Sequence, residues 1–230
     1  MSTVLITGAN RGLGLEFARQ YAADGWTVHA CCRAPGKAKD LKALAAQNAN
    51  VTVHGLDVCD EASVRSLGEA LGSQAIDVLI NNAGVYGGDR QAFGKVDAEQ
   101  WSPTLRTNAL GPLMVTEELI DNVARGANKV VACVTSKMGS MADNTSGGAY
   151  IYRASKAALN AVVVSMARDL KGRGVTVLAF HPGWVKTDMG GRNAPVTPAD
   201  SIAGMRKQIA RVKPTDSGKF LNYDGATIPW

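Results

Sequence analysis

The stretch "TVLITGANRGLG" (3–14) joins an apolar run to a glycine-rich turn and then to a helical pattern. Its glycines have the spacing T-G-x-x-x-G-x-G. Glycine lacks Cβ and tolerates positive φ, so this turn lets phosphates approach the backbone. The helix that opens near Leu13 adds unpaired N–H donors. We therefore predict that a dinucleotide is bound here, by Gly8, Asn10, Arg11, Gly12, Leu13 and Gly14. The alternative is a simple strand-to-helix turn.

Seven apolar runs alternate with helical patterns along the chain. The runs cover 3–7, 27–32, 51–56, 76–81, 129–134, 175–180 and 219–223. They show little polar alternation, which is typical of strands buried on both faces of a parallel sheet. Apolar residues at three- and four-residue spacing predict helices between them, for example over 13–25, 61–72 and 157–172. We therefore predict an α/β fold, a single Rossmann domain over 1–230 with a doubly wound seven-stranded parallel sheet and helices on both faces.

Composition narrows the class of protein. The 230 residues suit one domain, and the net charge of +5 comes without a Lys/Arg run. This charge indicates a solvated surface or attraction for a phosphorylated small ligand, and no nucleic-acid partner is expected. The histidines lack metal-ligand spacing, so no metal site is predicted. The four cysteines form no C-x-x-C pair, and no run is long enough to span a membrane or resembles a signal peptide. A cytoplasmic protein is expected.

The segment about twenty residues past the glycines bears on which dinucleotide binds. An NAD site usually has an acid there for the ribose 2′-hydroxyl. This chain has Arg33 and Lys37, and the next acid is Asp40. A guanidinium pairs well with a 2′-phosphate. The sequence therefore favours NADP(H), with NAD(H) possible; the alternative is that Arg33 and Lys37 are only solvated charges.

A second motif lies in "GGAYIYRASKAALN" (147–160). Tyr152 and Lys156 are four apart, so on a helix they share one face. A nearby ammonium favours the phenolate and lowers the tyrosine pKa, which would let Tyr152 exchange a proton with a carbonyl or alcohol. The alternative is an ordinary amphipathic pair. Tyr150 points to another side of the helix and is the weaker candidate.

Seven motifs in order complete the pattern. They are "TGANRGLG", "LDV" (56–58), "NNAG" (81–84), "TNALG" (107–111), "SKMG" (136–139), "YRASK" (152–156) and "HPGWVKTDM" (181–189). With them the chain resembles the short-chain dehydrogenase/reductase family over nearly its whole length. The segment 136–160 and the ending "GKFLNYDGATIPW" resemble its C-factor-like and sniffer-like carbonyl reductases.

The resemblance implies a role for each matching residue. Tyr152 would be the general acid/base, Lys156 would bind the nicotinamide ribose, and Ser136 would hydrogen-bond the substrate oxygen. Asn108 would lie at a helix break that holds a water on the proton path; an ordinary helix cap is its alternative. Ser140 is a rival to Ser136, because both lie in one loop. The gap from Ser136 to Tyr152 is also somewhat longer than is usual in the family. The further cofactor contacts implied are Asp57, Val58, Asn82, Ala83, Gly84, Pro182, Gly183, Val185 and Thr187.

The function expected is NADP(H)-dependent hydride transfer between nicotinamide and a small-molecule carbonyl or alcohol. The alternative is a C-factor-like signalling or regulatory protein that binds nucleotide with little turnover. Substrate loops are expected at about 84–96, 137–149 and 184–198. The family resemblance also implies a homo-oligomer, a dimer or a tetramer.

Overall fold

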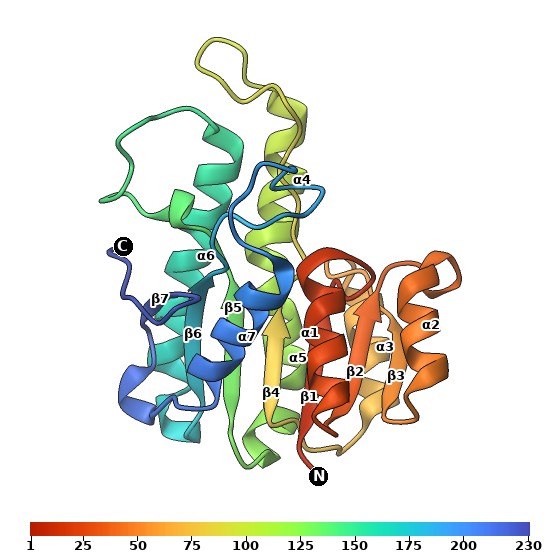
Figure 1. The fold of residues 1–230 in the computed structure, drawn as a ribbon. Helices are drawn as coiled ribbons and strands as arrows, with labels where there is room; N and C mark the ends of the chain where they lie inside the picture. Colours follow the sequence, from red (N-terminus) through yellow and green to blue (C-terminus); the bar gives the residue numbers. More distant parts are fainter.

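All seven predicted strands lie in one parallel sheet (Figure 1). The computed structural model describes residues 1–230. Along the sheet the order is β3-β2-β1-β4-β5-β6-β7, which confirms the doubly wound Rossmann fold. The strands are β1 (Thr3–Thr7), β2 (Thr27–Cys32), β3 (Val51–Gly55), β4 (Val78–Asn81), β5 (Val130–Val134), β6 (Thr176–His181) and β7 (Phe220–Asn222).

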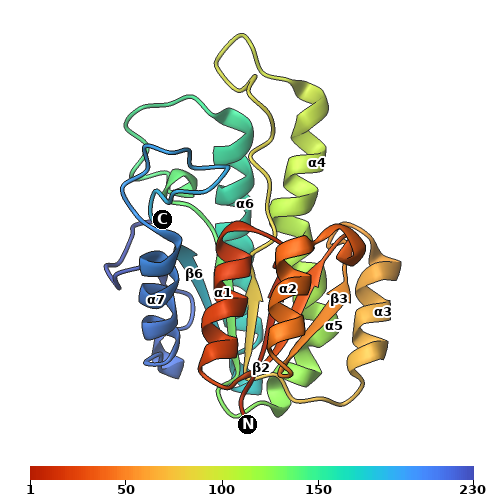
Figure 2. The same cartoon turned by 45° about the vertical axis from the view of Figure 1, so that its right-hand side comes forward.

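Helices cover both faces of the sheet (Figure 2). On one face are α1 (Gly12–Ala23), α2 (Lys39–Gln47) and α7 (Pro198–Ile209). On the other are α3 (Glu61–Leu71), α5 (Gly111–Arg125) and α6 (Tyr150–Asp169), with α4 (Trp101–Leu105) beside α6. The 3₁₀ turns are η1 (Pro35–Lys37), η2 (Ala98–Gln100), η4 (Lys137–Gly139), η5 (Lys171–Arg173) and η6 (Pro214–Asp216), and η3 (Arg106–Leu110) is a π-helix. No helix is both long and apolar enough to cross a bilayer.

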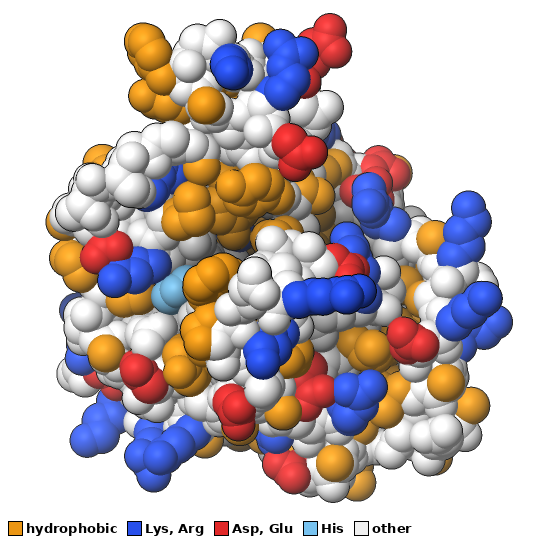
Figure 3. Space-filling view, turned by 45° about the horizontal axis from the view of Figure 1, so that its top comes forward, with side chains coloured by type: hydrophobic (Ala, Val, Ile, Leu, Met, Phe, Trp, Pro, Cys, Tyr) orange, Lys and Arg blue, Asp and Glu red, His pale blue; other side chains and the backbone are white.

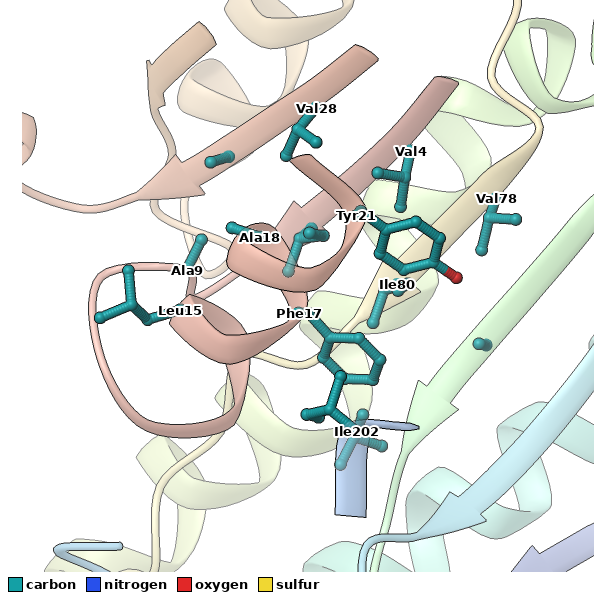
Figure 4. Close-up of a cluster of buried hydrophobic side chains, with 14 of the residues drawn as sticks. Val4, Ala9, Leu15, Phe17, Ala18, Tyr21, Val28, Val78, Ile80 and Ile202 are labelled. Atoms are coloured by element: carbon teal, nitrogen blue, oxygen red, sulfur yellow. The ribbon is translucent and has the colours of Figure 1, made fainter. Parts of the chain in front are cut away.

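The sheet separates two apolar layers, because successive side chains of a strand point to opposite faces. Val4 and Ile6 of β1 pack in the apolar layer under α1, to which α1 contributes Phe17 (Figure 4). Leu5 packs in the opposite layer, which contains Leu119 of α5. A strand covered on both sides needs apolar residues at every position, which explains the unbroken apolar runs in the sequence.

The strand order reverses at the boundary between β1 and β4. From β1 to β3 the strands are added on one side of β1, and from β4 to β7 they are added on the other side. At the carboxyl ends of these strands the backbones come close, and a Cβ on Gly8 would lie 2.9 Å from Ala83 Cα. Thr7 Oγ1 accepts hydrogen bonds from the Asn82 and Ala83 amides, each at 3.0 Å. Ligands of doubly wound sheets bind at such a switch point. We therefore expect a ligand site at the upper edge of the sheet in Figure 1, where the strand arrows end.

A histidine pair joins β2 to the edge strand β3. His29 Nδ1 lies 2.9 Å from His54 Nε2, and His29 Nε2 is buried without a partner. Burial lowers the pKa of His29 to about 4, with a further contribution from His54, and also lowers the pKa of His54 itself. The unfolded chain, with an ordinary histidine pKa near 6.5, therefore binds more protons than the folded chain between about pH 6.5 and 4.

We expect the folded state to lose stability as pH falls through this window. The double variant His29→Val/His54→Thr removes both groups and keeps β-forming residues, so its melting temperature should fall less between pH 7 and pH 4.5 than that of the wild type. Thermal melts at stepped pH measure this difference. Parallel losses in both proteins would show that the pair does not contribute.

Candidate active site

A cavity runs along the carboxyl ends of β1, β2, β4 and β5. It brings together most of the site residues predicted from the sequence, although they come from six separate segments. The predicted residues that line it are Gly8, Asn10, Arg11, Gly12, Leu13, Gly14, Arg33, Asp57, Val58, Asn82, Ala83, Gly84, Tyr152, Lys156, Pro182 and Thr187.

The glycine turn has the backbone form that the sequence predicts. Gly8 and Gly12 have φ of +67° and +55°, a region that favours glycine. A Cβ on Gly14 would lie 2.2 Å from the Gly8 carbonyl oxygen, so no larger residue fits there. Helix α1 begins at Gly12, and no side chain caps its first N–H groups. An uncapped helix N-terminus at a cavity wall is a suitable position for a phosphate.

Three cations lie along this part of the cavity. Arg33 and Lys37 line it just after β2, as predicted. Arg11 also lines it, and its guanidinium contacts Asp188 of the loop after β6 at 2.5 Å. Both members of this ion pair are largely exposed, so their attraction is weak in water. Asp57 also lines the cavity, but its Oδ1 already accepts a hydrogen bond from the Cys59 amide at 2.9 Å.

Tyr152 and Lys156 stand one turn apart on α6, near the other end of the cavity. Tyr152 is 8% exposed and Lys156 is 4% exposed. The Lys156 ammonium lies 5.8 Å from the centre of the Tyr152 ring and donates to the Val134 carbonyl at 3.0 Å. The helix thus presents both groups on one face, as their spacing predicts.

The electrostatics of this pair differ from the sequence-based expectation. Burial raises the pKa of Tyr152 to about 12, while the neighbouring Ser136 hydroxyl acts in the opposite direction. Burial also lowers the pKa of Lys156 to about 8. We expected the ammonium to lower the tyrosine pKa, but desolvation is the largest effect on Tyr152 and raises its pKa. Both groups are pushed toward their neutral forms.

Ser136 and Ser140 lie in one loop but have different partners. Ser136 sits at the start of η4, accepts from the Met138 amide at 3.1 Å and neighbours the Tyr152 phenol. The Ser140 hydroxyl donates to the carbonyl of Pro229 at 2.6 Å. Its proton is therefore engaged by the segment that ends at Trp230, and the geometry favours Ser136 as the hydroxyl beside Tyr152.

Asn108 lies behind the cavity wall rather than in it. It is fully buried inside the π-helix η3, so the break in regular α-helix that the resemblance implies is present and Asn108 is not an ordinary cap. Its Oδ1 accepts from the Val85 amide at 2.8 Å, and its Nδ2 donates to the Val85 carbonyl at 2.8 Å and to Ser155 Oγ at 2.9 Å. Asn108 therefore ties the chain after β4 to the helix that carries Tyr152.

Two predicted contacts lie outside the cavity. A Cβ on Gly183 would lie 3.0 Å from the Tyr223 ring, so Gly183 faces the protein. Val185 is buried and pairs with Val196 in a short bridge that closes the loop after β6. Both residues shape this loop, while Pro182 and Thr187 reach the cavity itself.

Sequence reasoning missed two residues of the loop after β4. The Tyr86 ring lies 4.9 Å from the Tyr152 ring, and Tyr86 further raises the pKa of Tyr152. Gln91 is buried and accepts a hydrogen bond from the Tyr152 amide at 2.8 Å. No spacing or motif marks either residue, because their contacts depend on the path of a glycine-rich loop.

Comparison with known proteins identifies the family. The family model for short chain dehydrogenases matches residues 2–196. The chain therefore belongs to the short-chain dehydrogenase/reductase family of oxidoreductases, which confirms the resemblance seen in its motifs.

Individual relatives fall in the subgroup suggested by the sequence. The chain is 50% identical to C-signal of Myxococcus xanthus over 155 residues, which cover 67% of this chain and 93% of that protein. It is 38% identical to 1-hydroxy-2-glutathionyl-2-methyl-3-butene dehydrogenase of Rhodococcus sp. (strain AD45) over the whole of both chains.

Solved structures of carbonyl reductases have a closely similar fold. The carbonyl reductase Sniffer of D. melanogaster superposes with a TM-score of 0.92, at 31% identity and full coverage of both chains. The NADPH-bound carbonyl reductase from chicken fatty liver gives a TM-score of 0.92 at 33% identity, covering 100% of this chain and 99% of that one.

The raised pKa of Tyr152 can be tested on the protein without ligand. An ordinary tyrosine is half ionised near pH 10, whereas Tyr152 should remain a neutral phenol there. The phenolate absorbance at 295 nm should therefore follow the same curve in the wild type and in Tyr152→Phe up to about pH 10. An extra ionisation in the wild type below that pH would show that burial does not dominate.

Proposed function

We propose that the protein is an NADP(H)-dependent oxidoreductase that transfers a hydride between nicotinamide and a carbonyl or alcohol substrate. The observation that carries this proposal is the arrangement at one end of the cavity. A buried tyrosine with a serine hydroxyl beside it and a buried lysine one turn away lie at the edge of a dinucleotide-shaped cleft. A protein that only bound nucleotide would not need all three groups.

The cavity fits a dinucleotide that carries a 2′-phosphate. The start of α1 in the glycine turn has no side-chain cap and borders the cavity, where a pyrophosphate would bind. Arg33 and Lys37 line the cavity after β2, where they would pair with a 2′-phosphate. Solved structures of the fold include an NADPH-bound carbonyl reductase. The nicotinamide, when bound, supplies or accepts the hydride. NADP(H) is therefore proposed as the preferred cofactor, with NAD(H) a possible second one.

The chain's own residues would handle the proton and the oxygen. Tyr152, whose neutral phenol form burial favours further, donates a proton to the carbonyl oxygen during reduction. The Ser136 hydroxyl donates a hydrogen bond to the same oxygen as negative charge develops on it. Lys156 binds ribose hydroxyls and, as the ammonium, favours the phenolate that remains after proton transfer. In the reverse direction the phenolate accepts the proton of an alcohol.

The surroundings of Tyr152 favour an apolar substrate. Figure 3 looks obliquely down on the carboxyl edge of the sheet, where apolar side chains gather in a hollow with charges around its rim. Tyr86, Trp184 and Met189 are large apolar residues that stay 39%, 58% and 51% exposed. They belong to the segments 84–96 and 184–198, which we propose as substrate loops together with 137–149. An uncharged carbonyl with a hydrophobic body suits this wall.

A second candidate function is signalling or regulation through nucleotide binding with little turnover. The similarity to C-signal favours it. The full-length similarity to a dehydrogenase favours turnover. Two further expectations remain predictions: assembly into a dimer or tetramer, and location in the cytoplasm.

The main test is NADPH oxidation at 340 nm with a panel of diketones, quinones and keto esters. We expect the wild type to turn over part of the panel. Tyr152→Phe should lower kcat by about 10²–10⁴-fold, because the proton donor is lost, while its affinity for NADPH survives. Tyr150→Phe is the matched control and should stay close to wild type, since Tyr150 is 41% exposed and its ring contacts Phe93.

The outcomes separate the two candidate functions. Tight NADPH binding by a wild type that turns over no carbonyl would favour the regulator. A Tyr152→Phe variant that stays active while Tyr150→Phe fails would refute the assignment of the acid.

Arg33→Ala tests the choice of cofactor. Loss of one charge-assisted contact should weaken NADPH binding by roughly ten- to a hundredfold and change NADH binding little. Arg65→Ala, an exposed arginine on α3, is the control for net charge. Dissociation constants from cofactor fluorescence measure both effects, and equal losses for the two cofactors would contradict the 2′-phosphate argument.

A further inference from the structure

Gln91 is a buried polar residue in an otherwise exposed loop. Its side chain is 3% exposed, whereas Asp89, Arg90, Ala92 and Phe93 around it are all exposed. The loop runs along the top of the molecule between β4 and α4, next to the start of α6 (Figure 1). Burying an amide costs free energy unless all its hydrogen bonds are made. Gln91 must therefore find its partners within the protein.

The first partners of Gln91 are backbone amides at the start of α6. This helix follows Ala149, which has a φ of +46° and offers no side-chain cap. Gln91 replaces that cap from a distant part of the sequence. Its Oε1 accepts from the Tyr152 amide at 2.8 Å, and its backbone carbonyl accepts from the Tyr150 amide at 3.1 Å. Two of the four amides that a helix start leaves without partners are thus satisfied by one residue.

The second partners of Gln91 lie in its own loop. Its Nε2 donates to the carbonyls of Tyr86 at 2.9 Å and Gly88 at 2.7 Å. These bonds fold the chain into a tight turn in which Gly87 and Gly88 have φ of +89° and +79°. The turn places the Tyr86 ring 4.9 Å from the ring of Tyr152. One amide group thus holds both tyrosines, each through its own backbone.

We infer that Gln91 is a positioning residue for Tyr152. Its acceptor oxygen fixes the first turn of α6 and hence the phenol beside Ser136, and its amino group fixes the Tyr86 wall of the substrate site. The inference rests on the proposed function, because it assigns these effects to proton transfer and to substrate binding. Gln91 itself does not line the cavity.

The carbonyl oxygen and the amino group of Gln91 can be changed separately. This distinguishes positioning of Tyr152 from simple anchoring of the loop. Gln91→Met has nearly the same size and makes none of the side-chain bonds. Gln91→Glu keeps an acceptor for the Tyr152 amide but loses both donors to the loop. If Gln91 only anchored the loop through its amino group, Gln91→Glu would be impaired at least as much as Gln91→Met, because its buried carboxylate would face the carbonyls of Tyr86 and Gly88.

The test measures steady-state kinetics of carbonyl reduction with NADPH for the wild type, Gln91→Met and Gln91→Glu. Gln91→Met should lose roughly ten- to a hundredfold in kcat, as a misplaced reacting group does. Gln91→Glu should retain kcat within about threefold and raise the KM of the carbonyl, because binding rather than chemistry is affected. Gln74→Met, a substitution of the same type at an exposed glutamine between α3 and β4, away from the cavity, is the control and should match the wild type. Equal kcat values for the Met and Glu variants would overturn the inference.

Amide hydrogen exchange gives a reading that needs no turnover. The Tyr152 amide should exchange faster in Gln91→Met than in the wild type and remain protected in Gln91→Glu. Melting temperatures and NADPH affinity show whether each variant is folded. If the wild type reduces no carbonyl, the proposed function fails while the exchange data still judge the cap. If the wild type is active but Tyr152 exchange is the same in all three proteins, the inference about Gln91 fails alone.

Discussion

The close approach of two backbone turns, after β1 and after β4, is the constraint on which the rest of the site depends. A Cβ on Gly8 would press on Ala83, and a Cβ on Gly14 would press on the Gly8 carbonyl and the Asn82 amide group. The Thr7 hydroxyl fastens the two turns together. Because β1 and β4 are neighbours only through the doubly wound order, this contact lies at the centre of the sheet, and the cavity extends to both sides of it. One side leads to Arg33 after β2 and the other to Tyr152 on α6.

Burial shifts the pKa values of Tyr152 and Lys156 in opposite directions. Desolvation raises the pKa of Tyr152 and lowers that of Lys156, so burial disfavours the charged form of each group. A neutral phenol is the form that donates a proton to a carbonyl. Under the proposed function, this neutral phenol favours reduction, and oxidation of an alcohol would need a positive charge near Tyr152 that favours the phenolate. The sequence pattern alone could not show this, because spacing reports proximity but not burial.

The sequence predicted those parts of the site in which chemistry follows from local order. The glycine turn and the Tyr152–Lys156 pair each lie within a few residues, and a strand or helix fixes their geometry. All seven strands and their parallel arrangement followed from unbroken apolar runs. Gly183 and Val185 show the limit of motif matching, since they belong to the motif but face away from the cavity. The choice between Ser136 and Ser140 also needed coordinates, because it depends on a hydrogen bond to Pro229.

The start of α6 shows why the role of Gln91 could not be predicted from the sequence. A helix that carries its own cap has a start that is stable whatever the loops around it do. Here the preceding residues Gly147, Gly148 and Ala149 all have positive φ, and none supplies a cap. The helix start is completed only when the loop after β4 delivers Gln91 to it. The loop also holds Tyr86 beside Tyr152, so the proposed substrate wall and the proposed proton donor share one support. Movement of this loop would therefore change substrate binding and the position of the proton donor together.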